Sequence, residues 1–199
     1  MSVVRQHLLD RRLARASRWI ACSPQRAKSV AEHSYYVART ARRICHLLKV
    51  RGVRVNRKKL KIDVLKVVDM ALMHDEPEAV TGDVPLPVES VSQDFKKESE
   101  RILREEYAGI PQGDYFIDLW CECNRPVSDD SLERQIVSVA DAIAGYAECI
   151  EELDLGNRNF QEYNNRYAML IGQFDYDWFE PIRDELGFKG ISKRRRRHN

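Results

Sequence analysis

Glycine and proline are scarce in this 199-residue chain, which contains nine glycines and seven prolines. Because turn-rich β folds need both residues, their scarcity favours an all-α fold. No apolar run approaches the roughly 18 residues that a membrane-spanning helix needs, so no membrane association is expected. The opening residues MSVVRQHLLDRRLARAS lack the apolar segment of a secretory signal. A content of 43% apolar and 32% charged residues instead predicts one compact helical domain over residues 1–192.

Paired cysteine motifs are also missing. The number of cysteines is odd, no C-x-x-C motif occurs, and the residues are scattered at Cys22, Cys45, Cys121, Cys123 and Cys149. A disulfide framework or a zinc ribbon would need regular pairs of cysteines. We therefore expect reduced thiols and a cytoplasmic location.

Acidic residues are nearly absent from the first third of the chain. Residues 1–61 carry 17 Lys/Arg and two acids, whereas residues 62–192 carry 11 basic and 29 acidic residues. This asymmetry favours an electrostatic field around a site over a uniform nucleic-acid surface, although a chance distribution over solvated helices is an alternative. Residues 193–199, KRRRRHN, form a basic tail that we expect to be disordered. Nucleic-acid binding is expected only through this tail, if at all.

Apolar periodicity and terminal signals predict helices over residues 2–16, 30–50, 60–75, 90–107, 114–123, 129–153, 158–172 and 175–186. The helix over 30–50 carries His33 on its buried side, because His33, Val37, Ile44 and Leu47 fall within about 40° of one line. The segment SRWIACSPQRAKS at 17–29 is expected to be a loop.

The helix over 60–75 has apolar residues on every face, which predicts a central, buried helix. Pro77 cannot continue it, so His74 and Asp75 occupy its last turn and Glu78 follows directly. The segment TGDVPLP after them is expected to be an irregular loop.

Four polar side chains at or near apolar helix faces suggest a metal site. His33, His74, Asp75 and Asp141 combine two imidazoles with two carboxylates, a set suited to a divalent transition ion. Asp141 lies about 120° from the apolar stripe of its helix, and small neighbours such as Gly145 would allow another helix to approach. A hydrogen-bonded core histidine at 33 and a solvated helix end at 74–75 are the structural alternatives.

The order H…HD…D of these residues is the signature of the HD-domain metal-dependent phosphohydrolases. The match extends to RW at 18–19, VAEHS at 30–34, HDEPEAVTGDVPLPV at 74–88 and ADAIAGYAECIEEL at 140–153. Together these segments resemble the YfbR-type 5′-deoxynucleotidases. The resemblance implies a single helical HD domain and a homo-oligomer, a dimer or larger. The C-terminal segment FDYDWFEPIRDEL could supply the interface between subunits or close the core.

The resemblance also implies roles for residues that match the family's motifs. One Co²⁺, Mn²⁺ or Zn²⁺ ion would be held by His33, His74, Asp75 and Asp141. Asp75, Glu78 and Arg18 would be catalytic, with Glu78 positioning groups or moving a proton and Arg18 gripping phosphate. Trp19 would shape the pocket and disfavour a ribose 2′-hydroxyl, although a core anchor is its structural alternative. The substrate would touch Arg18, Trp19, His33, Asp75, Asp83, Val84, Pro85, Leu86 and Asp141.

The activity implied is release of phosphate from deoxynucleoside 5′-monophosphates through attack by a metal-bound water. One alternative is a deoxynucleoside triphosphate triphosphohydrolase, because the chain is also similar to phage proteins of the DatZ type, which act on dATP. Arg26 and Lys28 could contact the extra phosphates, or lie on a surface loop, which we favour. A non-catalytic HD protein that binds nucleic acid is a third hypothesis.

Overall fold

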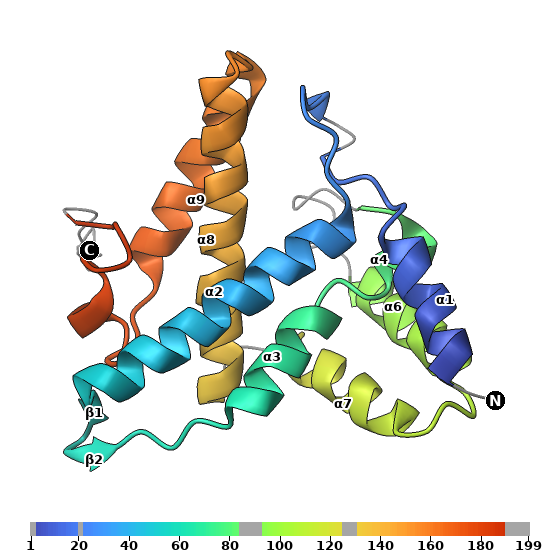
Figure 1. The fold of residues 1–199 in the computed structure, drawn as a ribbon, viewed down its shortest axis with the longest axis horizontal. Helices are drawn as coiled ribbons and strands as arrows, with labels where there is room; N and C mark the ends of the chain where they lie inside the picture. Colours follow the sequence, from blue (N-terminus) through green and yellow to red (C-terminus); the bar gives the residue numbers. More distant parts are fainter. Residues whose placement is uncertain (1–2, 20–21, 84–92, 125–130, 190–199) are drawn as a thin grey trace.

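The computed structural model describes residues 3–19, 22–83, 93–124 and 131–189, and nearly all of its regular structure is helical (Figure 1). The predicted all-α fold is therefore confirmed. The described helices are α1 (Val3–Leu13), α2 (Val30–Arg51), α3 (Val64–Met73), α4 (Glu78–Thr81), α6 (Gln93–Glu106), α7 (Gly113–Cys123), α8 (Leu132–Asp154) and α9 (Gln161–Gln173), with short 3₁₀ helices η3 (Arg158–Phe160) and η4 (Glu180–Ile182). None of these helices is long and apolar enough to cross a bilayer.

Helix α2 begins and ends where its sequence provides caps. The hydroxyl of Ser29 accepts a hydrogen bond from the backbone N–H of Glu32, which satisfies one of the free donors of the first turn. Gly52 follows the last turn with a left-handed φ of 60°, and its N–H returns to the carbonyl of Lys49. Glycine adopts this conformation without steric cost, so the chain turns sharply here into the segment that follows.

The core forms where α2 crosses α8 and α3, with α9 beside α8 (Figure 1). Ile44 of α2, Met70 of α3 and Val139 of α8 are completely buried in the same apolar cluster. A second apolar cluster joins α1 to α6 and α7 and includes Leu9 and Leu103. The crossing of α2 and α8 is the feature that later brings His33 and Asp141 together.

Helix α3 differs from its prediction in its ends and in its burial. Asp63 caps its first turn by accepting the N–H of Lys66, and the helix ends at Met73, one turn before Pro77. The prediction of all-round burial was wrong, because Val64, Leu65 and Leu72 are 42%, 69% and 43% exposed. Helices α2, α7 and α8 contact α3 but leave these three side chains exposed.

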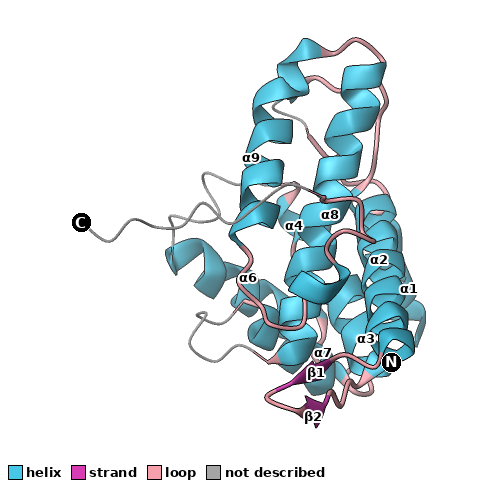
Figure 2. Ribbon diagram, turned by 90° about the vertical axis from the view of Figure 1, so that its left-hand side faces the viewer, coloured by secondary structure: helices cyan, strands magenta, loops and turns pink. Residues whose placement is uncertain are grey.

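Two short strands form a hairpin that the sequence analysis did not predict. Strands β1 (Arg54–Val55) and β2 (Lys58–Lys59) pair antiparallel, with Val55 opposite Lys58, at one end of an otherwise helical molecule (Figure 2). The two residues of the turn, Asn56 and Arg57, have φ values of 50° and 64°. Positive φ at both central positions is the geometry that matches the twist of a tight hairpin.

The prediction of a helix over residues 175–186 was also wrong. This segment consists of turns and the 3₁₀ helix η4, which contains Pro181. Trp178, Phe179 and Ile182 are nonetheless buried against the main core. The segment therefore closes the core, which was one of its two predicted roles, and the spacing of its buried residues follows turns rather than a continuous helix.

Candidate metal centre and active site

Three side chains from three separate helical regions converge on one point. His33 lies in α2, His74 caps the end of α3, and Asp141 lies in α8. Each offers one potential ligand atom, and these atoms lie within 4.8 Å of one another. The Nε2 atom of His33 is 3.0 Å from Oδ1 of Asp141, and Nε2 of His74 is 3.8 Å from the same oxygen. Residues predicted from separate motifs thus form one cluster.

Asp75 completes the cluster from its place next to His74. Its Oδ2 atom is 3.1 Å from Nε2 of His74 and 3.8 Å from Nε2 of His33. Ligand atoms that each lie about 2.1 Å from a single ion are about 3.0–3.4 Å apart. The contacts of 3.0 and 3.1 Å match this spacing, and the two contacts of 3.8 Å are wider.

The orientation of both imidazoles fits metal binding. Nδ1 of His33 is 2.8 Å from a carboxylate oxygen of Glu148, and Nδ1 of His74 is 2.8 Å from the carbonyl oxygen of Ala71. Because these partners accept, each Nδ1 carries the hydrogen and each Nε2 points into the cluster. Nε2 of His74 is buried, and its 3.1 Å contact with Oδ2 of Asp75 lacks the geometry of a hydrogen bond. A metal ion would satisfy this atom.

The charges of the cluster reinforce one another. Burial opposes the imidazolium form of His74, but the neighbouring Asp75 and Asp141 carboxylates outweigh it and raise the pKa of His74 to about 9. Burial likewise opposes ionisation of Asp75, but His74, His33 and Arg18 hold the pKa of Asp75 well below its usual range. The cluster thus keeps its carboxylates ionised, as ligands of a cation must be, and a bound metal ion would have to displace the proton from Nε2 of His74, because only neutral imidazole is a ligand.

Glu148 organises this site and was not among the predicted residues. One of its oxygens accepts Nδ1–H of His33, and the other lies 3.0 Å from Nε of Arg18 and 2.7 Å from Nε1 of Trp19. Burial opposes its ionisation, but His33 and Arg18 hold the pKa of Glu148 well below its usual range. Glu148 follows Asp141 by seven residues, two helical turns, so this spacing was the signal in the sequence.

Arg18 is placed between the carboxylates of the site. Its guanidinium Nη1 lies 3.5 Å from Asp75 and 3.7 Å from Asp83, while Nε contacts Glu148. The side chain is buried, and these negative neighbours outweigh the cost of burial and raise the pKa of Arg18 further. A permanent cation with a fork of donors next to a metal ligand is suited to binding phosphate.

Trp19 has the packing of a core anchor, the structural alternative for this residue. It is buried, and its ring makes edge contacts with Phe160 and Tyr163 at centroid distances of 5.2 and 5.3 Å. Its backbone N–H donates to Asp83 at 2.7 Å, and its φ is 63°. A tryptophan in this conformation is strained by about 1–3 kcal/mol, which these contacts must offset. The residue therefore anchors the core and fixes Asp83 beside Arg18.

Glu78 begins helix α4 immediately after the cluster. Its backbone N–H bonds to the carbonyl of Asp75 at 3.0 Å, and its side chain is half-buried. Pro77 occupies the N-cap position of α4 and has helical torsion angles. It therefore starts the new helix instead of stopping the old one. Val84, Pro85 and Leu86 lie outside the described residues.

Arg26 and Lys28 do not belong to the cluster. Nζ of Lys28 is 2.6 Å from Glu151, and Arg26 lies 3.5 Å from Glu32. Arg26 is exposed as predicted, but Lys28 is buried, so its predicted surface position was wrong. The loop that contains Lys28 is held against α8. There the carboxylate of Glu152 accepts hydrogen bonds from the backbone N–H groups of Gln25 and Arg26.

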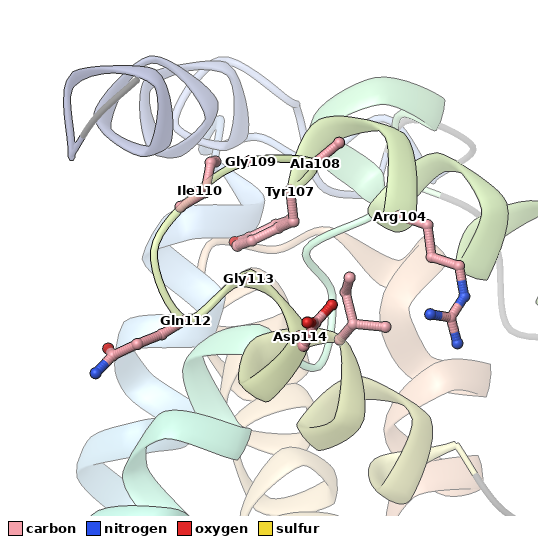
Figure 3. A pocket seen from close by; sticks show the side chains of 9 residues that line it. Arg104, Tyr107, Ala108, Gly109, Ile110, Gln112, Gly113 and Asp114 are labelled. Carbon is pink, nitrogen blue, oxygen red and sulfur yellow. The ribbon is translucent and has the colours of Figure 1, made fainter.

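A separate hollow lies at the junction of α6 and α7 (Figure 3). Its volume is about 430 Å³, and Tyr107, Ile110, Gln112 and Asp114 are among the residues that line it. No member of the metal cluster lines this hollow, and its cation, Arg104, is paired with Glu100 at 2.6 Å. It is therefore not the candidate active site.

The model of the family described as 5′-deoxynucleotidase YfbR-like matches residues 8–179. The chain belongs to this family. Among its curated relatives, the 5′-deoxynucleotidase yfbR of Photorhabdus temperata is 31% identical over 157 residues, which cover 75% of this chain and 74% of the relative. A 5′-deoxynucleotidase of Cronobacter sakazakii is 30% identical over 168 residues, covering 81% and 79%. The predicted resemblance is thus confirmed, and the YfbR-like chain is a hydrolase.

Solved structures share the fold of this YfbR-like chain. The PH0347 protein of Pyrococcus horikoshii superposes with a TM-score of 0.74 at 26% identity, covering 92% of this chain and 98% of the other. The cyanophage S-2L HD phosphohydrolase DatZ, solved with dA and one catalytic Zn²⁺, gives a TM-score of 0.58 at 17% identity, covering 90% and 93%. The second likeness shows that the fold is shared.

Proposed function

We propose that this deoxynucleotide phosphohydrolase removes phosphate from deoxynucleoside 5′-monophosphates. The observation that carries the proposal is the position of Arg18, whose Nη1 lies 3.5 Å from Asp75, next to the cluster of His33, His74 and Asp141. A phosphate held between a cation site and this guanidinium would have its charge neutralised from two sides. The names of the curated relatives support the same substrate class.

In the proposed reaction, water adds to phosphorus, the bond from phosphorus to O5′ breaks, and the deoxynucleoside and inorganic phosphate leave. A divalent ion held by His33, His74, Asp75 and Asp141 would supply Lewis acidity to water and phosphate. Glu78 would act as the acid–base group that transfers the proton to O5′, because it directly follows the cluster in the chain. The remaining roles belong to residues that hold the substrate.

Substrate contacts are proposed for residues around Arg18. Arg18 would hold the phosphate, and Trp19 and Asp83 would shape the sugar side of the pocket. Their mutual hydrogen bond of 2.7 Å supports a shared wall. Val84, Pro85 and Leu86 would extend this wall, and His33, Asp75 and Asp141 would face the phosphate.

Triphosphate hydrolysis, as in phage proteins of the DatZ type, is the second candidate. Further phosphates need further cations, and Arg26 and Lys28 were the two residues considered for this role in the sequence. Both are paired with carboxylates outside the cluster, at 3.5 and 2.6 Å. These pairs favour the monophosphate, because breaking them would have to be offset by the additional phosphates.

A substrate panel with product identification tests the proposal. Purified protein loaded with Co²⁺, Mn²⁺ or Zn²⁺ should release inorganic phosphate from dNMPs and little from the corresponding NMPs. Absence of phosphate from every dNMP with every ion would overturn it. Tripolyphosphate and deoxynucleoside formed from dNTPs would instead establish the second candidate.

We further propose that the site takes one ion per chain, that the protein is a homo-oligomer, and that it works in the cytoplasm. The free cysteines support a reducing compartment. Leu65 and Leu72, seven residues apart on α3 and 69% and 43% exposed, offer an apolar face for contact between subunits. Elemental analysis of the purified protein and its molar mass by light scattering test the first two points.

A further inference from the structure

One stretch of the chain is exclusively basic and plays no part in the proposed reaction. Between Ile62 and the metal ligand His33 there is no Asp or Glu. The same stretch contains ten cationic residues, all exposed: Arg39, Arg42, Arg43, Lys49, Arg51, Arg54, Arg57, Lys58, Lys59 and Lys61. Such a density of one sign exceeds what solubility requires and points to an anionic partner.

The first half of this stretch forms a line along α2. At 100° per residue, Tyr35, Arg39, Arg42, His46 and Lys49 fall within about 40° of one another's mean direction. The line is about 21 Å long at 1.5 Å per residue. His33 lies on the opposite, buried side of α2, so this basic stripe does not face the metal cluster.

The second half forms the β1–β2 hairpin, which extends the stripe beyond the end of α2 (Figure 1). The tight turn places Arg57 at its tip with a φ of 64°, a conformation in which glycine is normally favoured. Arg57 adopts this backbone conformation at an energetic cost, and its side chain adds a cation at the tip of the hairpin.

Few of these cations are neutralised by the protein itself. In the part of the chain that the structure describes, Arg51 is paired with Glu185 at 2.8 Å, and the other nine form no ion pair with a carboxylate. Arg39 instead contacts the hydroxyl of Tyr35 at 2.8 Å and lies over its ring at 5.6 Å. The positive charge is therefore available to a partner.

Two exposed aromatic rings stand at the start of the stripe. Tyr35 and Tyr36 are 50% and 48% exposed, and their rings meet edge to face at a centroid distance of 5.4 Å. Proteins that bind single-stranded nucleic acid combine cations along the path of the phosphate backbone with exposed aromatic rings on which the bases stack. Only unpaired bases can stack on such rings.

We propose that the α2 stripe and the hairpin form a binding surface for single-stranded nucleic acid. The cations contact phosphates without reading sequence, and Tyr35 and Tyr36 stack on bases. The surface is separate from the phosphohydrolase site, and it replaces the basic tail as the expected location of nucleic-acid contact.

The test uses the full chain and a fluorescent oligothymidylate of about 20 nucleotides, long enough to follow the whole surface. Anisotropy titrations between about 50 and 200 mM salt should show affinity that falls steeply with salt. The double variant Lys58→Glu, Lys59→Glu should weaken binding and reduce the slope of log affinity against log salt by about 0.7 for each lysine. The same change at Lys96 and Lys97, exposed on α6, is the matched control for net charge.

A second variant tests the rings. Tyr35→Ala should weaken binding of the single strand about tenfold and leave binding of a duplex unchanged. Phosphate release from dNMPs, measured on the same preparations, should be unaffected, which separates this proposal from the proposed function. The proposal is overturned if the wild type does not bind at low salt, if the α6 control weakens binding equally, or if Tyr35→Ala has no effect. Binding to phosphatidylglycerol vesicles in preference to the oligonucleotide would also overturn it.

Discussion

At the scale of single residues, the candidate site depends on which groups orient each proposed metal ligand. His74 is oriented by a backbone carbonyl in its own turn, whereas His33 depends on Glu148, a side chain 115 positions away in sequence. Glu148 also holds Arg18 and Trp19. One carboxylate thus couples the metal side of the site to its phosphate side, so a change here should affect both.

Glu148→Gln should lower metal affinity by about 10–100-fold, because the imidazole of His33 loses its charged partner. It should also raise KM for dNMPs, since Arg18 loses the ion pair that orients it. Metal titration by calorimetry and steady-state kinetics measure the two effects. Asp154→Asn, an exposed position on the same helix, is the control. Equal behaviour of the two variants would show that Glu148 has no organising role.

Asp75→Ala should abolish turnover and metal binding while leaving helical content unchanged. Asp75 contacts both histidines and Arg18, yet the apolar core between α2 and α8 does not include it. Elemental analysis after dialysis, phosphate release and circular dichroism check the three parts. Retained activity would refute its assignment as a ligand.

Glu78→Ala should keep the metal but lower kcat by about a hundredfold or more, as expected for a lost acid–base group. Its matched comparison is Glu78→Gln, which preserves size and removes the charge. Both variants should be similarly slow under the proposal. If Gln restores the wild-type rate, the role of Glu78 is structural.

At the scale of elements, the packing of α8 against α9 depends on one small residue. An alanine Cβ at position 145 would come within 2.7 Å of the Cε1 and Oη atoms of Tyr167. Tyr167 is buried, and its ring lies 6.2 Å from that of Trp19. The small residues near Asp141 predicted the approach of another backbone, but the group that packs against Gly145 is the side chain of Tyr167 from α9.

Gly145→Ala should destabilise the protein by about 1–3 kcal/mol, because a packed ring must move. The gain of up to about 1 kcal/mol in helix propensity opposes this but does not cancel it. Urea denaturation measures the difference. Adding Tyr167→Leu to the same chain should recover part of the loss, and failure of this double variant to do so would indicate that the clash is not the cause.

The elements also show what the sequence could and could not predict. Periodicity located α2 and the burial of His33, because one face of that helix enters the core. It failed for α3, since apolar content does not say how many neighbours a helix has. It placed Glu148 on the face of Asp141, seven residues earlier, but did not single it out, because its partners Arg18 and His33 come from distant segments. The segment around Phe179 was predicted to be a helix because its apolar spacing fits one. The same spacing also fits the turns and the 3₁₀ helix that the segment forms.

At the scale of the whole molecule, the metal cluster joins three parts of the chain. It links α2, the α3–α4 connection and α8, which are distant in sequence. An ion that binds only this folded arrangement stabilises it by mass action, by about 2.7 kcal/mol at a hundred times its dissociation constant. The ion should therefore act as a cross-link on the fold as well as a catalyst.

Removal of metal with EDTA should lower the melting temperature by about 5–10 °C, because a chain of this length shifts about 2–4 °C per kcal/mol. Adding back Co²⁺, Mn²⁺ or Zn²⁺ should restore it in proportion to affinity, and scanning calorimetry ranks the ions. Asp75→Ala should show no metal-dependent shift. An equal shift in that variant would place the stabilising ion elsewhere, and a wild type insensitive to EDTA and added ions would contradict the coupling of metal binding to folding.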